Sequence, residues 1–347
     1  MYPRERVLSA IAGKRTDRMP ANYSAHKDVN ERLMARLGVV DYESLLEVLG
    51  VDLRRIACNY YFPDEACGDG YFRSMWGVLY RKEKINDGNP DVILPFSEET
   101  TIDDVHAHTW PDANKLNYSN VTAECTKYAG KYALFGAPWS PFFHEIGWLI
   151  GQETFFIWMY TKPDVLEAII QHIVDFEVAA ARRFFESAKG LIDIAYYGND
   201  FGTQRGLFIS PEMWQKFIRP YLKKFFDVSH EYGCKVMQHS CGSVRELIPW
   251  FIKDGVDILD PVQVRAEGMD LAGLAQDFGD KLCFHGGVDT QYTLPFGTTE
   301  DVREQVRYYR KIFKDTGKYI LAGSQEYISD ISTDNIIAIY EENMRCK

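Results

Sequence analysis

The chain has 347 residues, 46% of them hydrophobic, which is enough to bury a large core. Its formal net charge of -11 argues against nucleic acid as a partner, because an acidic surface repels phosphate backbones. No apolar run approaches the roughly 20 residues that cross a bilayer, and the charged N-terminus opens no signal peptide, so we expect a cytoplasmic protein with no membrane contact. Seven scattered cysteines without a Cys-x-x-Cys pair argue against a disulfide framework and a zinc ribbon.

The first half of the chain predicts short strands separated by helices and one long insertion. We expect strands over residues 19–23, 52–58 and 132–136, and a helix near 27–38. Residues of about 59–120 are rich in Gly, Pro, Asp and aromatic side chains, and they predict an extended insertion with a hairpin. A helical zone from about 151 to 188 should break at Pro163, because proline cannot lie inside a helix.

The second half predicts a regular alternation of strands and helices. Strands are expected over 192–197, 235–239, 256–259, 282–285 and 319–322, and helices over 211–232, 243–254, 270–278, 299–315 and 332–345. The strands are apolar without clean alternation, which is typical of a parallel sheet buried on both faces. An open doubly wound sheet fits equally, but no dinucleotide or P-loop motif occurs. We therefore predict a single α/β domain over 1–347, a (β/α)8 TIM barrel with an N-terminal helical extension.

In such a barrel the site is built at the carboxyl ends of the strands. Six or more of the predicted ends carry polar side chains, more than loop polarity predicts, which indicates an enzyme. The alternative for any one of them is a cap or a turn. The candidate catalytic residues are His239, His285 and Asp200, and the candidate substrate-binding residues are Tyr60, Trp139, Asn199, Gln204, Gln263, Asp289 and Gln325.

His239 and Cys241 are the pair with the clearest chemistry. One intervening residue after a strand can aim both side chains at one point, and imidazole with thiolate suits zinc. The alternative is a histidine bonded to backbone beside an inert buried cysteine. His285 could act as a general acid or base, since its ordinary pKa lies near neutrality, or it could fix a loop. Asp200 and Asp289 could orient histidines or bind a substrate hydroxyl.

Seven stretches together resemble the uroporphyrinogen decarboxylase superfamily over nearly the whole chain. They are residues 4–8, 16–20, 108–112, 198–204, 239–243, 255–263 and 285–289, which read RERVL, TDRMP, HTWPD, GNDFGTQ, HSCGS, GVDILDPVQ and HGGVD. The resemblance implies the TIM-barrel fold. It also implies one of two activities, decarboxylation or cobalamin-dependent methyl transfer.

The resemblance favours the methyltransferase branch. The decarboxylases carry an Arg-Gln-Ala-Gly-Arg stretch that is missing here, whereas the methyltransferases bind zinc through His-x-Cys and a later Cys. This chain keeps His239 and Cys241 but has Ser324 in place of the later cysteine. The candidates for completing a metal set are Asp260, Cys283, His285 and Glu326. The Asp-x-His-x-x-Gly corrinoid motif is also missing, so a separate corrinoid protein should carry the cobalamin.

The predicted activity is therefore corrinoid-dependent transfer of a methyl group from a small methylated substrate. An aryl methyl ether, cleaved by O-demethylation, is suggested by aromatic residues such as Tyr61, Trp76 and Trp139. The alternatives are a lyase acting on a carboxylated small molecule and a non-catalytic barrel that binds a ligand or partner. A homodimer stays open.

Overall fold

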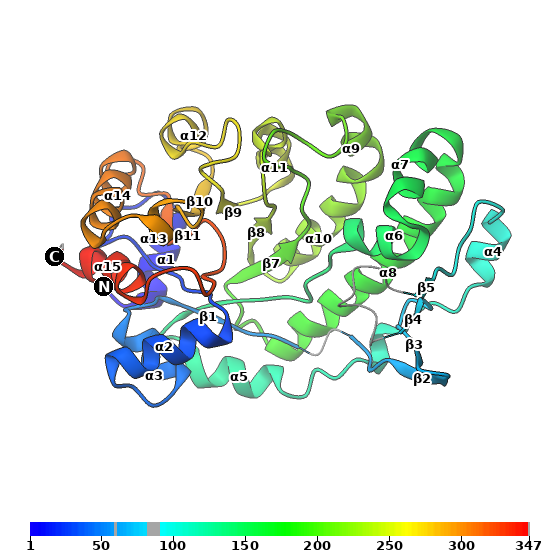
Figure 1. Ribbon diagram of the computed structural model, residues 1–347, viewed down its shortest axis with the longest axis horizontal. Helices are drawn as coiled ribbons and strands as arrows, with labels where there is room; N and C mark the ends of the chain where they lie inside the picture. The colour runs from blue at the N-terminus through cyan, green and yellow to red at the C-terminus, as the bar shows by residue number, and fades with distance from the viewer. Residues whose placement is uncertain (59–60, 82–90, 346–347) are drawn as a thin grey trace.

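The computed structural model describes residues 1–58, 61–81 and 91–345 (Figure 1). Its main sheet has seven strands, each parallel to its neighbours and ordered as in the chain. They are β1 (Leu53–Arg55), β6 (Ala133–Phe135), β7 (Ile194–Gly198), β8 (Lys235–His239), β9 (Ile258–Val262), β10 (Cys283–Val288) and β11 (Tyr319–Gly323). The prediction of a parallel α/β sheet is confirmed, and β8 has the predicted bounds.

The first predicted strand, over residues 19–23, is an isolated bridge instead of a ladder. Ala21 pairs in parallel with Leu321 of β11, and the amide of Leu321 donates to the carbonyl of Pro20 over 2.8 Å. On the other side the amide of Asp52 donates to Ala21 O over 2.8 Å. Pro20 has no N–H, and the Asp52 carboxylate takes the N–H of Ala21, so a longer ladder cannot form. The segment still lies between the two edge strands of the sheet.

Helices follow most strands and cover the outer face of the sheet (Figure 1). They are α2 (Lys27–Leu37), α3 (Tyr42–Val48), α5 (Val121–Tyr128), α6 (Phe142–Ile150), α7 (Gln152–Thr161), α8 (Pro163–Ala188), α9 (Pro211–Phe217), α10 (Arg219–Glu231), α11 (Ile248–Asp254), α12 (Leu271–Phe278), α13 (Thr293–Phe296), α14 (Thr299–Ile312) and α15 (Thr333–Met344). The predicted helix over 211–232 is two helices, because Pro220 must lie in a first turn. The break at Pro163 is confirmed.

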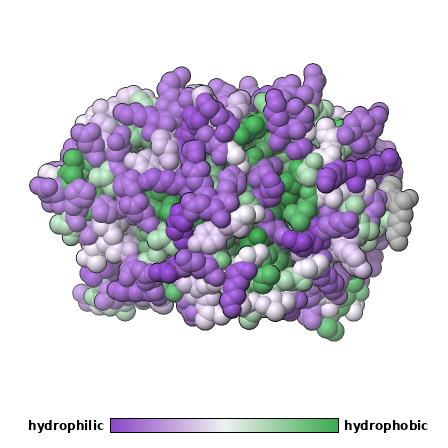
Figure 2. All heavy atoms as spheres, turned by 180° about the vertical axis from the view of Figure 1, so that it is seen from behind, coloured by the Kyte–Doolittle hydropathy of each residue, from purple (hydrophilic) through white to green (hydrophobic). Residues whose placement is uncertain are grey.

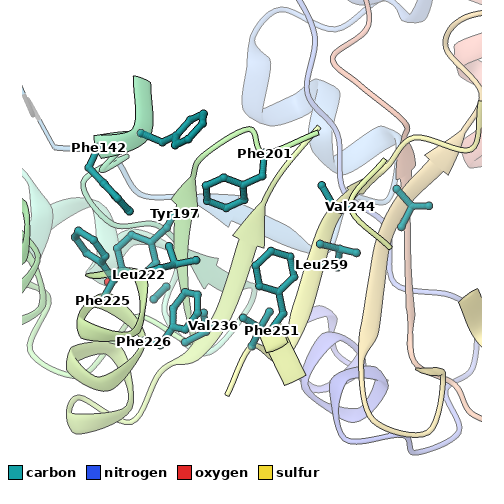
Figure 3. Close-up of a cluster of buried hydrophobic side chains, with 14 of the residues drawn as sticks. Phe142, Tyr197, Phe201, Leu222, Phe225, Phe226, Val236, Val244, Phe251 and Leu259 are labelled. Atoms are coloured by element: carbon teal, nitrogen blue, oxygen red, sulfur yellow. The ribbon is translucent and has the colours of Figure 1, made fainter. Parts of the chain in front are cut away.

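Apolar side chains hold these helices to the sheet. Figure 3 shows Tyr197 of β7 and Val236 of β8 packed against Phe225 and Phe226 of α10, with Phe251 of α11 beside them. All five are almost completely buried. At the amino ends of the strands, the interior is filled by a second apolar cluster that includes Val7 and Ile11 of α1 (Pro3–Ile11). The strands are thus fixed on their outer face and at their amino ends.

The insertion after β1 contains a small antiparallel sheet instead of one hairpin. Its strands are β2 (Glu65–Gly68), β3 (Tyr71–Arg73), β4 (Leu79–Arg81) and β5 (Val92–Ile93), followed by α4 (Ile102–Ala107). Trp76 anchors it on α8, where its ring lies 5.3 Å from that of Phe176. The face in Figure 2 is mainly hydrophilic, with apolar side chains in smaller patches. Within the described ranges, no helix has the length and apolar character of a membrane span.

Candidate functional site

A cavity of about 820 Å³ opens at the carboxyl ends of the parallel strands. Strands or their following loops from β1 around to β11 contribute to it. The predicted site residues in its lining are Trp139, His239, Asp260, His285, Gln325 and Glu326. The cavity is large enough for a small organic ligand. The two predicted histidines, which are 46 positions apart in the sequence numbering, therefore share one space.

Asp260, in the middle of β9, joins the two histidines. Its Oδ2 lies 2.7 Å from Nδ1 of His239, and its Oδ1 lies 2.5 Å from Nδ1 of His285. Nε2 of His239 faces the other way, 3.3 Å from Oδ1 of Asp200 and 3.5 Å from Sγ of Cys241. One carboxylate thus orients both imidazoles, and His239 connects it to a second carboxylate and a thiol.

The charges of this network support one another. Burial alone would lower the pKa of His239, but Tyr196, Asp200 and Asp260 raise it well above its ordinary value. Burial opposes ionisation of Asp260, yet His285 and His239 hold its pKa far below the usual range. The same opposition applies at Asp200, where the hydrogen bond from His239 prevails and the pKa is lowered. The structure therefore favours an imidazolium between two carboxylates.

Three side chains of this network suit a metal ion. Ligand atoms of Asp200, His239 and Cys241 all lie within 4.8 Å of one another. Oxygen, nitrogen and sulfur are the donors that zinc takes in catalytic sites, where three protein ligands leave the fourth position open. Asp260 holds the second nitrogen of His239, as carboxylates do for metal-bound histidines. The residues present fit zinc.

The predicted additional ligands are placed differently. Asp260 is engaged by both histidines, and Cys283 is buried in the apolar interior with α1, where burial raises its pKa to about 12. Glu326 reaches the cavity, but it accepts a hydrogen bond of 2.6 Å from Ser24. Cys283 as a ligand is therefore wrong, because its side chain points into the sealed amino-terminal half of the interior.

The residue that faces Cys241 from the last strand is Gln325, not Ser324. Nε2 of Gln325 lies 3.3 Å from Sγ of Cys241. Ser324 is buried, and its hydroxyl lies 2.9 Å from that of Thr290. An amide thus stands beside the thiol where the resemblance led us to look for a second cysteine.

Trp139 forms one wall of the cavity. Its ring centre lies 5.0 Å from that of Tyr196 and 5.1 Å from that of His239, in edge-to-face geometry. The ring passes so close to Gly198 that a Cβ there would lie 1.9 Å from it. Gly198 is therefore required for this wall, and the prediction that Trp139 lies at the site is supported by its position.

Two predicted substrate-binding residues instead hold loops in place. Oδ1 of Asn199 accepts from the amide of Phe143 over 3.0 Å. Asp289 accepts from the amide of Gln291 over 2.9 Å and pairs with Arg265 at 2.7 Å. The Asn199 amide and the Asp289 carboxylate thus already have partners in the fold. Neither residue is in the described lining of the cavity. These are the caps and turns of the alternative interpretation.

Two more predicted residues lie beside the cavity without lining it. Oε1 of Gln263 accepts from the amide of Gly242 over 2.9 Å, and Nε2 of Gln204 donates to the same oxygen. They fix the loop that carries Cys241. Tyr60 lies outside the described residues.

Among the cavity residues that sequence reasoning missed, Tyr196 and Arg55 lie beside the network and Trp139. The hydroxyl of Tyr196 donates to Oδ2 of Asp260 over 2.7 Å, and Arg55 ends β1 beside Trp139. The signal for Tyr196 was the period of two in β7, which directs Ile194 and Tyr196 to the same side. For Arg55 there was no signal beyond its place at the end of a short strand.

Fold and site define an α/β enzyme-like protein with a parallel sheet and a polar cavity at the strand carboxyl ends. The sequence profile of the family described as "Uroporphyrinogen decarboxylase (URO-D)" matches residues 84–343. The chain belongs to the uroporphyrinogen decarboxylase family.

Two curated relatives are methyltransferases. The chain is 25% identical over 181 residues to "Methylcobamide:CoM methyltransferase MtbA" of Methanosarcina acetivorans, covering 51% of this chain and 49% of the relative. It is 24% identical over 176 residues to the protein of the same description from Methanosarcina mazei, covering 51% and 48%. The chain thus matches about half the length of these relatives. The likeness places it beside the methyltransferase branch of the family.

A solved structure described as a methyltransferase from Methanosarcina mazei has a similar fold. It superposes with a TM-score of 0.65 at 15% identity and covers 99% of both chains. At this identity the likeness supports the fold alone.

Proposed function

We propose that the protein is a corrinoid-dependent methyltransferase that moves a methyl group from a small methylated substrate to the cobalamin of a separate corrinoid protein. The observation that carries the proposal is the set of Asp200, His239 and Cys241, which His239 connects to the cavity residues Asp260 and His285. The family and the two methyltransferase relatives support it. We also propose that the sheet is a single-domain (β/α)8 barrel, with the bridge at residue 21 as its eighth position.

Zinc is held by Asp200, His239 and Cys241 in this proposal, and when bound it supplies a Lewis acid for the leaving heteroatom. Asp260 keeps Nδ1 of His239 occupied, so that Nε2 stays directed at the ligand set. The three ligand atoms already lie within 4.8 Å of one another, so these residues would hold the ion together.

His285 supplies the proton. In a methyl ether the carbon–oxygen bond breaks, the methyl group passes to cobalt(I), and the bonding electron pair stays on the oxygen. Asp260 at Nδ1 and Asn22, whose Nδ2 lies 3.0 Å from Nε2, fix the ring of His285 inside the cavity. For His285 to protonate the leaving oxygen, the substrate must take the place of the Asn22 amide at Nε2, because Nδ2 of Asn22 is a donor and holds that nitrogen unprotonated.

The finer substrate class that we propose is an aryl methyl ether. Three aromatic rings line the cavity, and the centre of Tyr196 lies 5.5 Å from that of Phe135 and 5.0 Å from that of Trp139. Such a wall accepts a planar ring by stacking or edge contact. The reactive group of that ring then lies toward His239, which contacts Trp139.

The test mixes zinc-loaded protein, a reduced corrinoid protein and a panel of methoxylated aromatic compounds, methylated amines and thiols. We expect the absorbance of methylcobalamin to appear with at least one methoxylated compound, and to be lost with His239→Ala. Absence of any spectral change across the panel would overturn the proposal. Carbon dioxide release without cobalamin, measured in the same samples, would favour the lyase instead.

A further inference from the structure

Arg55 brings an unpaired positive charge to the cavity. It is the last residue of β1, its side chain is exposed, and it lines the cavity. Its guanidinium carbon lies 5.8 Å from the ring centre of Trp139 and 5.7 Å from that of Tyr196. Among the described residues, no hydrogen bond or ion pair reaches its guanidinium, so its five N–H donors are available to a ligand.

Its neighbour Arg54 shows the contrast. The Arg54 side chain is buried, pairs with Glu43 at 2.8 Å, and donates to the carbonyls of Val51 and Leu53. That arginine is fully used by the fold. The position of Arg55 is therefore not explained by the packing that surrounds β1.

The acidic groups of the cavity lining do not neutralise Arg55 either. Glu43 is taken by Arg54, and Asp260 by the two histidines. Glu326 accepts from Ser24, and Glu124 makes no ion pair with Arg55. An exposed guanidinium in a partly apolar cavity gains most from an anionic ligand, and its planar fork matches a carboxylate.

Trp139 relates this charge to the reactive network. The same indole ring lies near both the guanidinium of Arg55, at 5.8 Å, and the imidazole of His239, at 5.1 Å. A planar ligand against Trp139 and Tyr196 can therefore meet Arg55 with one end and the His239 network with the other.

We propose that the substrate is an aromatic carboxylate whose carboxyl group is bound by Arg55 and whose methyl-bearing group lies at His239. The methyl-bearing part rests on the proposed function, whereas the carboxylate part rests on Arg55 alone. This assignment narrows the aryl methyl ethers to methoxylated benzoates and acids of similar shape.

The experiment measures binding by calorimetry, without any corrinoid protein. The probes are methoxybenzoates with one or two methoxy groups at each ring position, each paired with its uncharged benzamide. The proteins are the wild type, Arg55→Met, Arg55→Lys and the control Arg15→Met, which removes another exposed arginine outside the cavity. Thermal unfolding of each variant checks that it is folded.

We expect the wild type to bind at least one benzoate about tenfold more tightly than its benzamide. Arg55→Met should weaken that benzoate about 10- to 100-fold and the benzamide less than about threefold, since a charge-assisted bond is lost only with the acid. Arg55→Lys should lie between, because it keeps the charge without the fork. Arg15→Met should bind like the wild type.

Equal affinity for acids and amides, no binding of any benzoate, or an unchanged Arg55→Met would overturn the inference. Methyl transfer from the benzamides at the benzoate rate would also contradict it while leaving the methyltransferase proposal intact. Conversely, an Arg55-dependent preference for acids without any methylcobalamin would refute the proposed function and keep the carboxylate assignment.

Discussion

Two of the charged networks among the described residues, one around Asp52 and one around Asp260, differ in whether any atom is left for a ligand. Near the amino ends of the strands, Asp52 is fully buried between Arg6 at 2.5 Å and Arg18 at 2.7 Å, and it also accepts from the amide of Ala21. Arg6 is further paired with Asp17 at 2.7 Å. Each charge has its partner inside the fold, so this closed network of Arg6, Asp17, Arg18 and Asp52 fixes α1 and the N-terminal segment to the sheet.

The network of His239, Asp260 and His285, the open network, is also charged, but its residues line the cavity. Nε2 of His239 at the end of β8, the Cys241 thiol in the loop that follows it, and the Asp200 carboxylate in the loop after β7 lie close together. Burial of charge is thus common to both regions, and only the second directs free ligand atoms toward a space. Contact with the cavity, rather than charge or burial, therefore distinguishes the network that we assign to the reaction from the network that stabilises the fold.

The largest effect should come from His239→Ala. We expect the rate of methylcobalamin formation to fall about a thousandfold, because the variant loses a metal ligand and the residue that Asp260 orients. Initial rates at saturating substrate and far-UV circular dichroism of the same samples measure this. A folded variant that keeps more than a tenth of the wild-type rate would place the chemistry elsewhere.

Asp52→Asn should produce the largest loss of stability. It leaves Arg6 and Arg18 buried without their shared counter-charge, which should lower the free energy of unfolding by about 3–5 kcal/mol. Urea unfolding followed by tryptophan fluorescence measures it. Asp103→Asn, at an exposed position, is the control and should change stability by less than about 0.5 kcal/mol. A loss below about 1 kcal/mol would mean that the closed network does not stabilise the fold.

Zinc affinity tests whether the residues at the open network bind a metal ion. The wild type should bind one zinc ion, and Cys241→Ser should weaken its affinity about 10- to 100-fold, measured by chelator competition. Gln325→Cys, which puts a thiol beside Cys241, should tighten binding. Less than a tenth of an equivalent of zinc in the loaded wild type would remove the metal from the account.

Glu145 is a buried carboxyl group outside both networks and gives the smallest effect. Burial raises its pKa from 4.5 to about 7, although the hydrogen bond from Tyr61 opposes this rise. Between these two values the folded protein keeps a proton that the unfolded chain releases, so the free energy of unfolding should fall as pH rises from 4.5 to 7.

Glu145→Gln should remove that fall. The variant should be about 1–3 kcal/mol more stable than the wild type at pH 8 and equal to it near pH 4.5. Urea unfolding at both pH values measures the difference. A stability difference that does not change with pH would show that Glu145 is ionised in the fold throughout this range.

Strand ends were predictable from the sequence, but the directions of side chains beyond them were not. Apolar runs located β8 to the residue, and the parallel order then brought His239 and His285 together, as predicted. Asn199 and Asp289 are also polar residues that directly follow a strand, yet their side chains accept hydrogen bonds from loop amides. Which polar residue caps a loop and which reaches the cavity depends on tertiary hydrogen bonds that spacing does not encode.

The sequence also did not single out the cavity residue Arg55, and the cause is related. Arg55 and Arg54 are adjacent in a short strand, and only the pairing of Arg54 with Glu43 decides which arginine remains free. The stretches around Arg6 and Asp17 contributed to the family resemblance, but they belong to the closed network. They therefore indicated the fold correctly and carried no information about the chemistry.

The most direct test compares Asp260→Asn with Asp52→Asn, measuring in each the free energy of unfolding and the methyl-transfer rate per folded molecule. We predict that Asp260→Asn lowers the rate at least about a hundredfold and loses less than half the stability that Asp52→Asn loses, since a histidine without its counter-charge can release its proton and an arginine cannot. Asp52→Asn should keep the rate within about twofold. The opposite pattern, with the rate unchanged in Asp260→Asn and lost in folded Asp52→Asn, would contradict the assignment of the reaction to the open network.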